Sequence, residues 1–136
     1  MSASRTRRGA LRATELSERV SQCLAAGSEQ DAWRLLLQFV DDFRGSAITG
    51  KIFLTKEAPG LIGDSRYDAA IAALVEHLCS ESDIPIPDWT GLPGRFFEPW
   101  WFPAGLPALE ASALRDSPIS FKRHGVFITA RALFRV

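Results

Sequence analysis

The sequence predicts a mainly α-helical protein with a single compact domain. Its 136 residues are enough for one domain, and a hydrophobic content of 46% is ordinary for a globular core. Apolar residues recur at helical spacing in several stretches, and only residues 126–128 look like a short strand-like piece near the C-terminus. We expect a disordered basic arm at residues 1–13 and a helical domain at residues 14–136.

Two helices joined by a glycine are expected to form an αα-hairpin at the N-terminus of the domain. Thr14 is a suitable N-cap for the first helix, over residues 15–26, and Gly27 suits the left-handed position after it. The second helix carries the most regular apolar stripe of the chain: Ala32, Leu35, Leu36, Phe39, Val40 and Phe43. Because the connection is so short, the two helices should lie antiparallel.

Two further helices follow a connection at residues 45–63, which we expect to contain one short helix or strand. The first covers residues 64–79 and includes four alanines that permit close packing. The second covers residues 106–115, with a proline near its start, where proline is tolerated. A short helical turn over residues 117–124 then ends at Gly125.

A long loop rich in aromatic residues and proline, residues 91–103, lies between those two helices. Five of its thirteen residues are aromatic, and its three prolines and two glycines exclude a regular helix or a central strand. Adjacent aromatic side chains cannot all face the core, so we expect part of the loop to be buried and part to contact a partner. The candidate contact residues are Trp89, Phe96, Phe97, Trp100, Trp101 and Phe102, with Lys122 and Arg123 to match an acidic surface.

Basic residues gather at both ends of the chain, although the formal net charge is zero. Residues 13–116 contain eight basic and sixteen acidic side chains. The simpler interpretation is a solvated tail and a basic C-terminal face, and the alternative is contact with a polyanion. A DNA-binding protein would neutralise phosphates with four arginines of the arm: Arg5, Arg7, Arg8 and Arg12. The second helix has an acidic open face, however, which does not suit a recognition helix.

No catalytic, metal or cofactor pattern is recognisable, so we expect neither an enzyme nor a bound metal or cofactor. His77 and Cys79 are two residues apart on one helix and point in different directions, which does not suit a shared metal ion. His124 follows two basic residues and is expected at the surface, at the end of a helix. An enzyme would be indicated instead by a pocket that joins Tyr67, His77, Asp88 and Trp89.

Three features that the sequence lacks indicate the cellular compartment of the protein. No apolar stretch approaches the length of a membrane span, and two cysteines are too few for a disulfide scaffold. Because no signal peptide is recognisable either, we expect a cytoplasmic protein without membrane contact.

Several segments resemble a group of small helical proteins from bacteria, chiefly actinobacteria. The similar segments are Arg66-Tyr-Asp-Ala-Ala-Ile-Ala-Ala-Leu-Val-Glu-His-Leu, Pro87-Asp-Trp, Pro99-Trp-Trp-Phe-Pro, Ser117-Pro-Ile-Ser-Phe-Lys-Arg-His-Gly-Val-Phe-Ile and Leu35-Leu-Leu-Gln-Phe-Val-Asp-Asp. Members of this group are encoded beside nucleotidyltransferase-like toxins and are taken for antitoxins or regulators. The resemblance implies a non-enzymatic, antitoxin-like protein that masks a toxin enzyme, and the aromatic loop would be the covering surface. A DNA-binding transcriptional regulator is the alternative.

Overall fold

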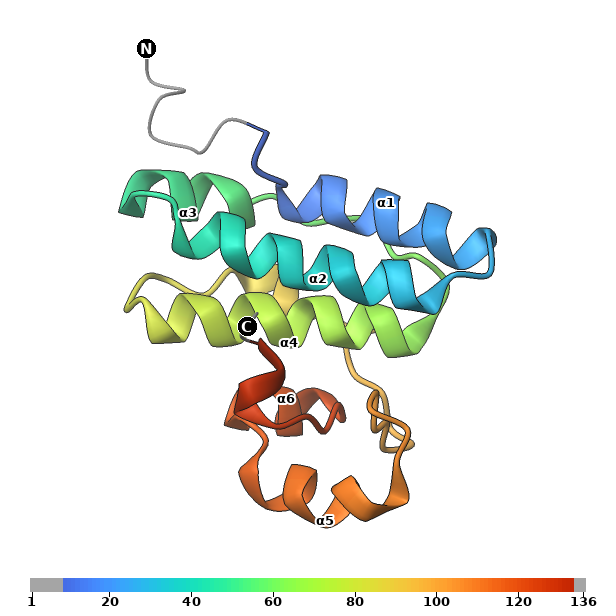
Figure 1. The fold of residues 1–136 in the computed structure, drawn as a ribbon. Coiled ribbons are helices and arrows are strands. Elements are labelled where there is room, and N and C mark those ends of the chain that lie inside the picture. The colour runs from blue at the N-terminus through green and yellow to red at the C-terminus, as the bar shows by residue number, and fades with distance from the viewer. Residues whose placement is uncertain (1–8, 134–136) are drawn as a thin grey trace.

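Helices form the regular structure of residues 9–133, the part of the chain that this computed structural model describes (Figure 1). Two short 3₁₀ helices occupy Asp88–Gly91 and Ala130–Leu133. The prediction of a mainly α-helical, single-domain fold is confirmed. Over the described residues, no helix combines the length and the apolar character that crossing a membrane requires. The α-helices are α1 (Ala13–Ala25), α2 (Glu29–Arg44), α3 (Ile48–Thr55), α4 (Ser65–Glu81), α5 (Pro107–Asp116) and α6 (Ile119–His124).

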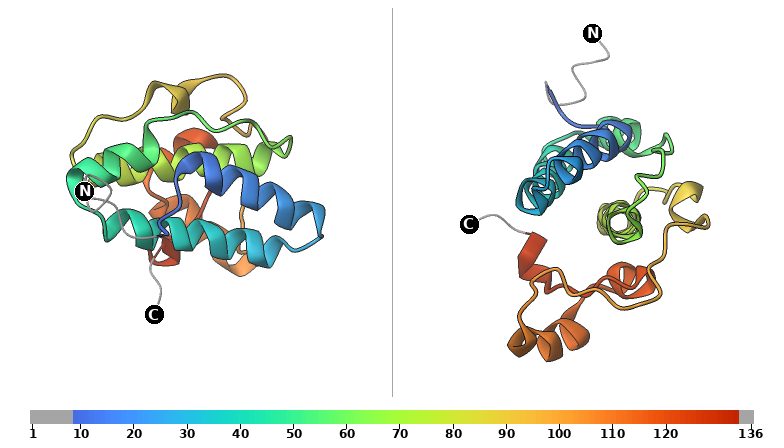
Figure 2. Two further views of the ribbon diagram at one scale, coloured as in Figure 1. Left: turned by 90° about the horizontal axis from the view of Figure 1, so that it is seen from above. Right: turned by 90° about the vertical axis from the view of Figure 1, so that its right-hand side faces the viewer.

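The predicted αα-hairpin is formed by α1 and α2, which lie antiparallel side by side (Figures 1 and 2). Gly27 has a φ of +79° and turns the chain between them. The prediction that Thr14 caps α1 is wrong, because Arg12 is the last extended residue and α1 starts at Ala13. The Arg12 backbone N–H donates a hydrogen bond to the Glu15 carboxylate at 3.0 Å, which satisfies one free amide at this helix end.

The central element of the domain is α4, which lies between the α1–α2 hairpin and a C-terminal unit that contains α5 and α6 (Figures 1 and 2). Twelve of its seventeen residues are buried, so neighbours cover it on nearly every side. Four of these residues are alanines without exposed surface, which allow adjacent elements to approach closely: Ala69, Ala70, Ala72 and Ala73.

The connection at residues 45–63, predicted to contain a short helix or strand, contains helix α3. Leu54 and Thr55 are buried at the end of this helix. The Thr55 carbonyl accepts a hydrogen bond from the Trp89 indole N–H at 2.9 Å, which links α3 to the segment that follows α4. The other face of α3 leaves three apolar side chains exposed: Ile48, Ile52 and Phe53.

The aromatic loop is held against the chain segment that follows α6. Three backbone N–H groups donate across this contact: Phe97 to the His124 carbonyl at 2.9 Å, Trp101 to the Gly125 carbonyl at 3.0 Å, and Phe127 to the Trp101 carbonyl at 2.8 Å. The predicted strand-like residues 126–128 therefore pair through a single parallel bridge, between Trp101 and Val126. Gly125 ends α6 with a φ of +82°, and the Phe97 carbonyl occupies the space of a Cβ atom there.

Gly125→Ala is expected to lower the free energy of unfolding by about 2–4 kcal/mol, because a Cβ atom would overlap the Phe97 carbonyl and the backbone would be strained. Gly27→Ala is the matched control: its φ of +79° is similar, but nothing lies within 4 Å of an added Cβ. The control should lose only about 1 kcal/mol. Chemical denaturation followed by circular dichroism measures both losses, and equal losses would contradict the close approach at Gly125.

Candidate functional site

The aromatic side chains predicted as partner contacts divide between the core and the surface. Trp89 is only 4% exposed and donates to the Thr55 carbonyl, so its predicted role as a contact is corrected to a core position. Phe96 and Trp100 are both exposed, and the exposed fraction of Trp100 is 63%. The remaining three are half-buried: Phe97, Trp101 and Phe102. Within the doublets, Phe96 is more exposed than Phe97 and Trp100 is more exposed than Trp101, so adjacent aromatic side chains do differ in burial.

A buried carboxylate on α4 joins two basic residues at the end of α6. Glu76 accepts two hydrogen bonds from the Arg123 guanidinium, both at 2.9 Å. Its Oε2 atom also lies 3.1 Å from His124 Nε2, while His124 Nδ1 contacts the Arg95 carbonyl oxygen. Each ring nitrogen of His124 therefore lies within hydrogen-bonding distance of an oxygen atom. The prediction that His124 lies at the surface is wrong, because it is fully buried against this carboxylate.

These contacts decide the charge state of Glu76 and the availability of the basic residues. Burial acts to raise the pKa of Glu76, but the hydrogen bonds and charges of Arg123 and His124 together hold this pKa below its ordinary value of 4.5. Arg123, predicted to match an acidic partner, is therefore engaged within the protein. Lys122, predicted with it, is exposed and donates to the Arg115 carbonyl at 3.2 Å.

A buried guanidinium, that of Arg95, anchors the start of the aromatic loop. Arg95 is 4% exposed, and its Nη2 atom donates to the Pro59 carbonyl. Its Nη1 atom lies 3.8 Å from Asp68 Oδ1, and its guanidinium lies 5.0 Å from the centroid of the Trp89 ring. Burial lowers the pKa of Arg95, and the Asp68 charge partly offsets this effect. These contacts fix the position of the chain where the aromatic loop begins.

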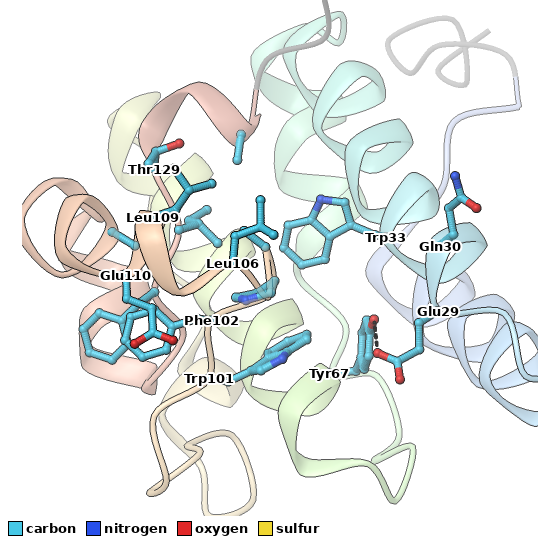
Figure 3. Close-up of a pocket in the computed structure, with 16 residues that line it drawn as sticks. Glu29, Gln30, Trp33, Tyr67, Trp101, Phe102, Leu106, Leu109, Glu110 and Thr129 are labelled. Carbon is cyan, nitrogen blue, oxygen red and sulfur yellow. Dashed lines mark hydrogen bonds between the residues drawn. The ribbon is translucent and has the colours of Figure 1, made fainter.

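An apolar pocket of about 410 Å³ lies between α2, the start of α4, the aromatic loop and α5 (Figure 3). Trp33 of α2 meets Trp101 of the loop edge to face, with ring centroids 6.2 Å apart, and Tyr67 of α4 lies 5.0 Å from Trp101. Leu106 and Leu109 cover the opposite side (Figure 3). The volume is within the range of ligand pockets in proteins. Other lining residues are Gln30, Phe102, Pro103, Ala104, Ala113, Phe127, Ile128, Thr129 and Ala132.

Two carboxylates, Glu29 and Glu110, are the charged side chains among the described residues that line this pocket. Glu29 accepts a hydrogen bond from the Tyr67 hydroxyl at 3.3 Å and pairs with Arg66 at 3.3 Å. Arg66 also pairs with Asp64 at 3.0 Å. Burial and then the Glu29 charge raise the pKa of Tyr67, so its hydroxyl stays protonated at neutral pH and acts as a donor.

Only part of this pocket follows from the sequence. Trp101 and Phe102, predicted as contact residues, both line it. Trp33, Tyr67 and Leu109 are recognisable only as residues of helix faces, because nothing in the sequence indicates that three separate elements meet. The one available signal is the helix at residues 106–115, whose leucines are more numerous than a solvated helix needs.

Other residues considered from the sequence lie in different places. Tyr67 lines the apolar pocket, whereas Asp88 and Trp89 line another one beside α3. Neither of these two pockets joins Tyr67 with Asp88 and Trp89, as the enzyme alternative would require. Arg12 contacts Glu15 at 3.6 Å and Glu57 at 3.7 Å, beside the start of α1. The other arginines of the predicted DNA-binding arm lie outside the described residues: Arg5, Arg7 and Arg8.

Comparisons of the chain with protein families, with curated proteins and with solved structures find no match. The antitoxin-like resemblance therefore remains a prediction from sequence.

Glu76→Gln is expected to lower the free energy of unfolding at pH 7 by about 2–4 kcal/mol, because it leaves Arg123 and His124 without a carboxylate. The loss should shrink in acid. Since the folded pKa of Glu76 is depressed, the unfolded state binds more protons, and the wild-type protein loses this stability as the pH falls below 4.5 through the folded pKa.

Chemical denaturation at pH 7 and at several values between about pH 5 and 3 measures this convergence. Glu18→Gln, on the exposed face of α1, is the control. If the two variants differ from the wild type by the same amount at every pH, Glu76 does not carry the proposed charge in the folded state.

Proposed function

We propose that this chain is a non-enzymatic binding protein that captures a partner protein by receiving a partner side chain in the pocket at the aromatic loop. The observation that carries the proposal is an open apolar pocket of about 410 Å³ with an aromatic wall. A site of this kind accepts a bulky anchor residue, which is the feature that dominates the free energy of many protein interfaces.

The side of the pocket formed by α5 supports this proposal. Ala113 is the only buried residue of α5, while Leu106 at its N-cap is 57% exposed and Leu109 is 42% exposed. Fully burying one such leucine is worth about 1.5–3 kcal/mol, so covering these exposed surfaces favours association. The domain itself leaves this apolar surface uncovered, and a partner that covers it would gain that free energy.

The exposed tryptophan of the aromatic loop extends the same surface. Trp100 packs against Phe127, with ring centroids 5.0 Å apart, and Phe127 lines the pocket. Trp100 therefore contacts a residue of the pocket wall, although it does not line the pocket itself. Exposed tryptophan beside a pocket is typical of interface residues that contribute strongly to binding.

The resemblance suggests what the partner is. In this proposal the protein acts as an antitoxin in the bacterial cytoplasm, and the partner is a toxin enzyme encoded by the adjacent gene. Covering the toxin with the pocket, α5 and Trp100 would mask it without any catalytic step. The same contacts would serve an interface of any other function, so the identity of the partner is the more specific part of the proposal.

Leu109→Asp and Trp100→Ala are each expected to weaken binding of the adjacent gene product by at least tenfold, because each removes apolar contact area at the proposed interface. Both side chains are exposed, so the fold should persist. Co-expression with the adjacent gene, followed by calorimetric titration of the purified proteins, measures the effect.

Ile48→Asp is the matched control, since it places the same charge at an exposed apolar residue on α3. It should bind like the wild type. Circular dichroism and thermal unfolding verify that all three variants are folded. Unchanged affinity for Leu109→Asp in a folded protein would overturn the assignment of the pocket as the binding site.

A further inference from the structure

We infer that the pocket selects a positively charged group on an apolar stem, so that the partner side chain it receives is a lysine or arginine flanked by apolar residues. This inference rests on the proposed function, in which a partner side chain enters the pocket. It adds the chemical class of that side chain, which follows from the charges and the aromatic rings around the pocket.

The charges around the pocket favour a cation. Glu29 reaches the pocket from α2 and Glu110 from α5, and none of the described residues that line it is basic. The basic group beside it, Arg66, is paired with both Glu29 and Asp64. Two carboxylates, Glu29 and Asp64, share the Arg66 guanidinium, and Glu110 adds a further negative charge elsewhere on the pocket wall. Because the carboxylates outnumber the guanidinium, an entering cation is attracted while an entering carboxylate is repelled.

Glu110 is the carboxylate with the most freedom to bind. Glu29 is already engaged by the Tyr67 hydroxyl and by Arg66. Glu110 makes no ion pair and no side-chain hydrogen bond with any other described residue. It is exposed and lines the pocket from α5, on the side away from Trp33 and Tyr67 in the view of Figure 3. A cation that enters beside Leu109 can pair with Glu110 without breaking an existing contact.

The aromatic wall favours the same class of ligand. Trp33, Tyr67 and Trp101 meet at the pocket, and indole rings are the best aromatic partners for cations. Trp101 already carries such a contact, because the Arg66 guanidinium lies 5.1 Å from its ring centroid. The alkyl stem of a lysine or arginine would meanwhile cover Leu106 and Leu109, as such stems do on apolar surfaces.

The test uses the full chain and three capped tripeptides that differ in the middle residue: Leu-Lys-Leu, Leu-norleucine-Leu and Leu-Glu-Leu. Titration is followed by NMR through the indole N–H signals of Trp33 and Trp101. The lysine peptide should bind roughly three- to tenfold more tightly than the norleucine peptide, and the glutamate peptide should bind most weakly. Equal affinities, or tighter binding of the glutamate peptide, would overturn the inference.

Two variants separate the charge effect from a change of fold. Glu110→Gln should remove most of the advantage of the lysine peptide and leave the norleucine affinity unchanged. Glu98→Gln removes an exposed charge of the aromatic loop that does not line the pocket, and it should leave all three affinities unchanged. A lysine advantage that persists in Glu110→Gln contradicts the role of this carboxylate.

Titration with hexylamine tests whether a free amine is the ligand, because hexylamine carries the same cation without a peptide. If it binds as tightly as the lysine peptide, the ligand is a free amine and the assignment to a partner side chain is overturned. The outcome is also separable from that of the proposed function. A lysine preference with unchanged partner binding in Leu109→Asp refutes the function alone, and lost partner binding without a lysine preference refutes only this inference.

Discussion

The arrangement of the C-terminal half depends on one buried carboxylate, Glu76 of the central helix. It receives two hydrogen bonds from Arg123 and contacts His124, and the His124 carbonyl in turn accepts from the Phe97 backbone. Phe96 stacks on the His124 ring with centroids 4.4 Å apart. Removing the charges from water is costly, so the site is favourable only because each partner is satisfied at once. The position of α6 and of the aromatic loop therefore follows from the same group.

The aromatic loop is held in place by backbone hydrogen bonds, although it forms neither a helix nor a regular strand. Several of its backbone groups are satisfied through bonds to residues 124–127 and through the contact of the His124 ring with the Arg95 carbonyl, while the buried Arg95 side chain ties the loop to the Pro59 carbonyl. Gly125 makes the close approach to Phe97 sterically possible. The result is a rigid support for Trp101, which forms part of the pocket wall while its neighbour Trp100 faces outward.

The contacts of Glu76 also change the charge that we expect of the partner surface. From sequence, Lys122 and Arg123 indicate contact with an acidic surface, but Arg123 is already paired with Glu76. The pocket instead presents Glu29 and Glu110, which favour a basic partner. The apolar surface of α5 and the carboxylate on that helix thus belong to one site. In the proposed interface, apolar contact area and charge preference would be combined there, as they are in interfaces that discriminate between partners.

The sequence by itself determined the α-helices other than α3, because their signals are local: apolar residues at helical spacing, Gly27 after α1 and Gly125 after α6. For α3 it left a helix and a strand open, because glycines and prolines interrupt the apolar pattern of residues 45–63. It also indicated that the aromatic loop must be divided between core and surface. Only the tertiary structure decided which aromatic residues are buried, and it placed His124 in the core against Glu76, 48 residues away in the sequence. The pocket also depends on the tertiary structure, because it forms only when α2, α4 and α5 come together around Trp101. No local sequence pattern indicates that these elements are neighbours.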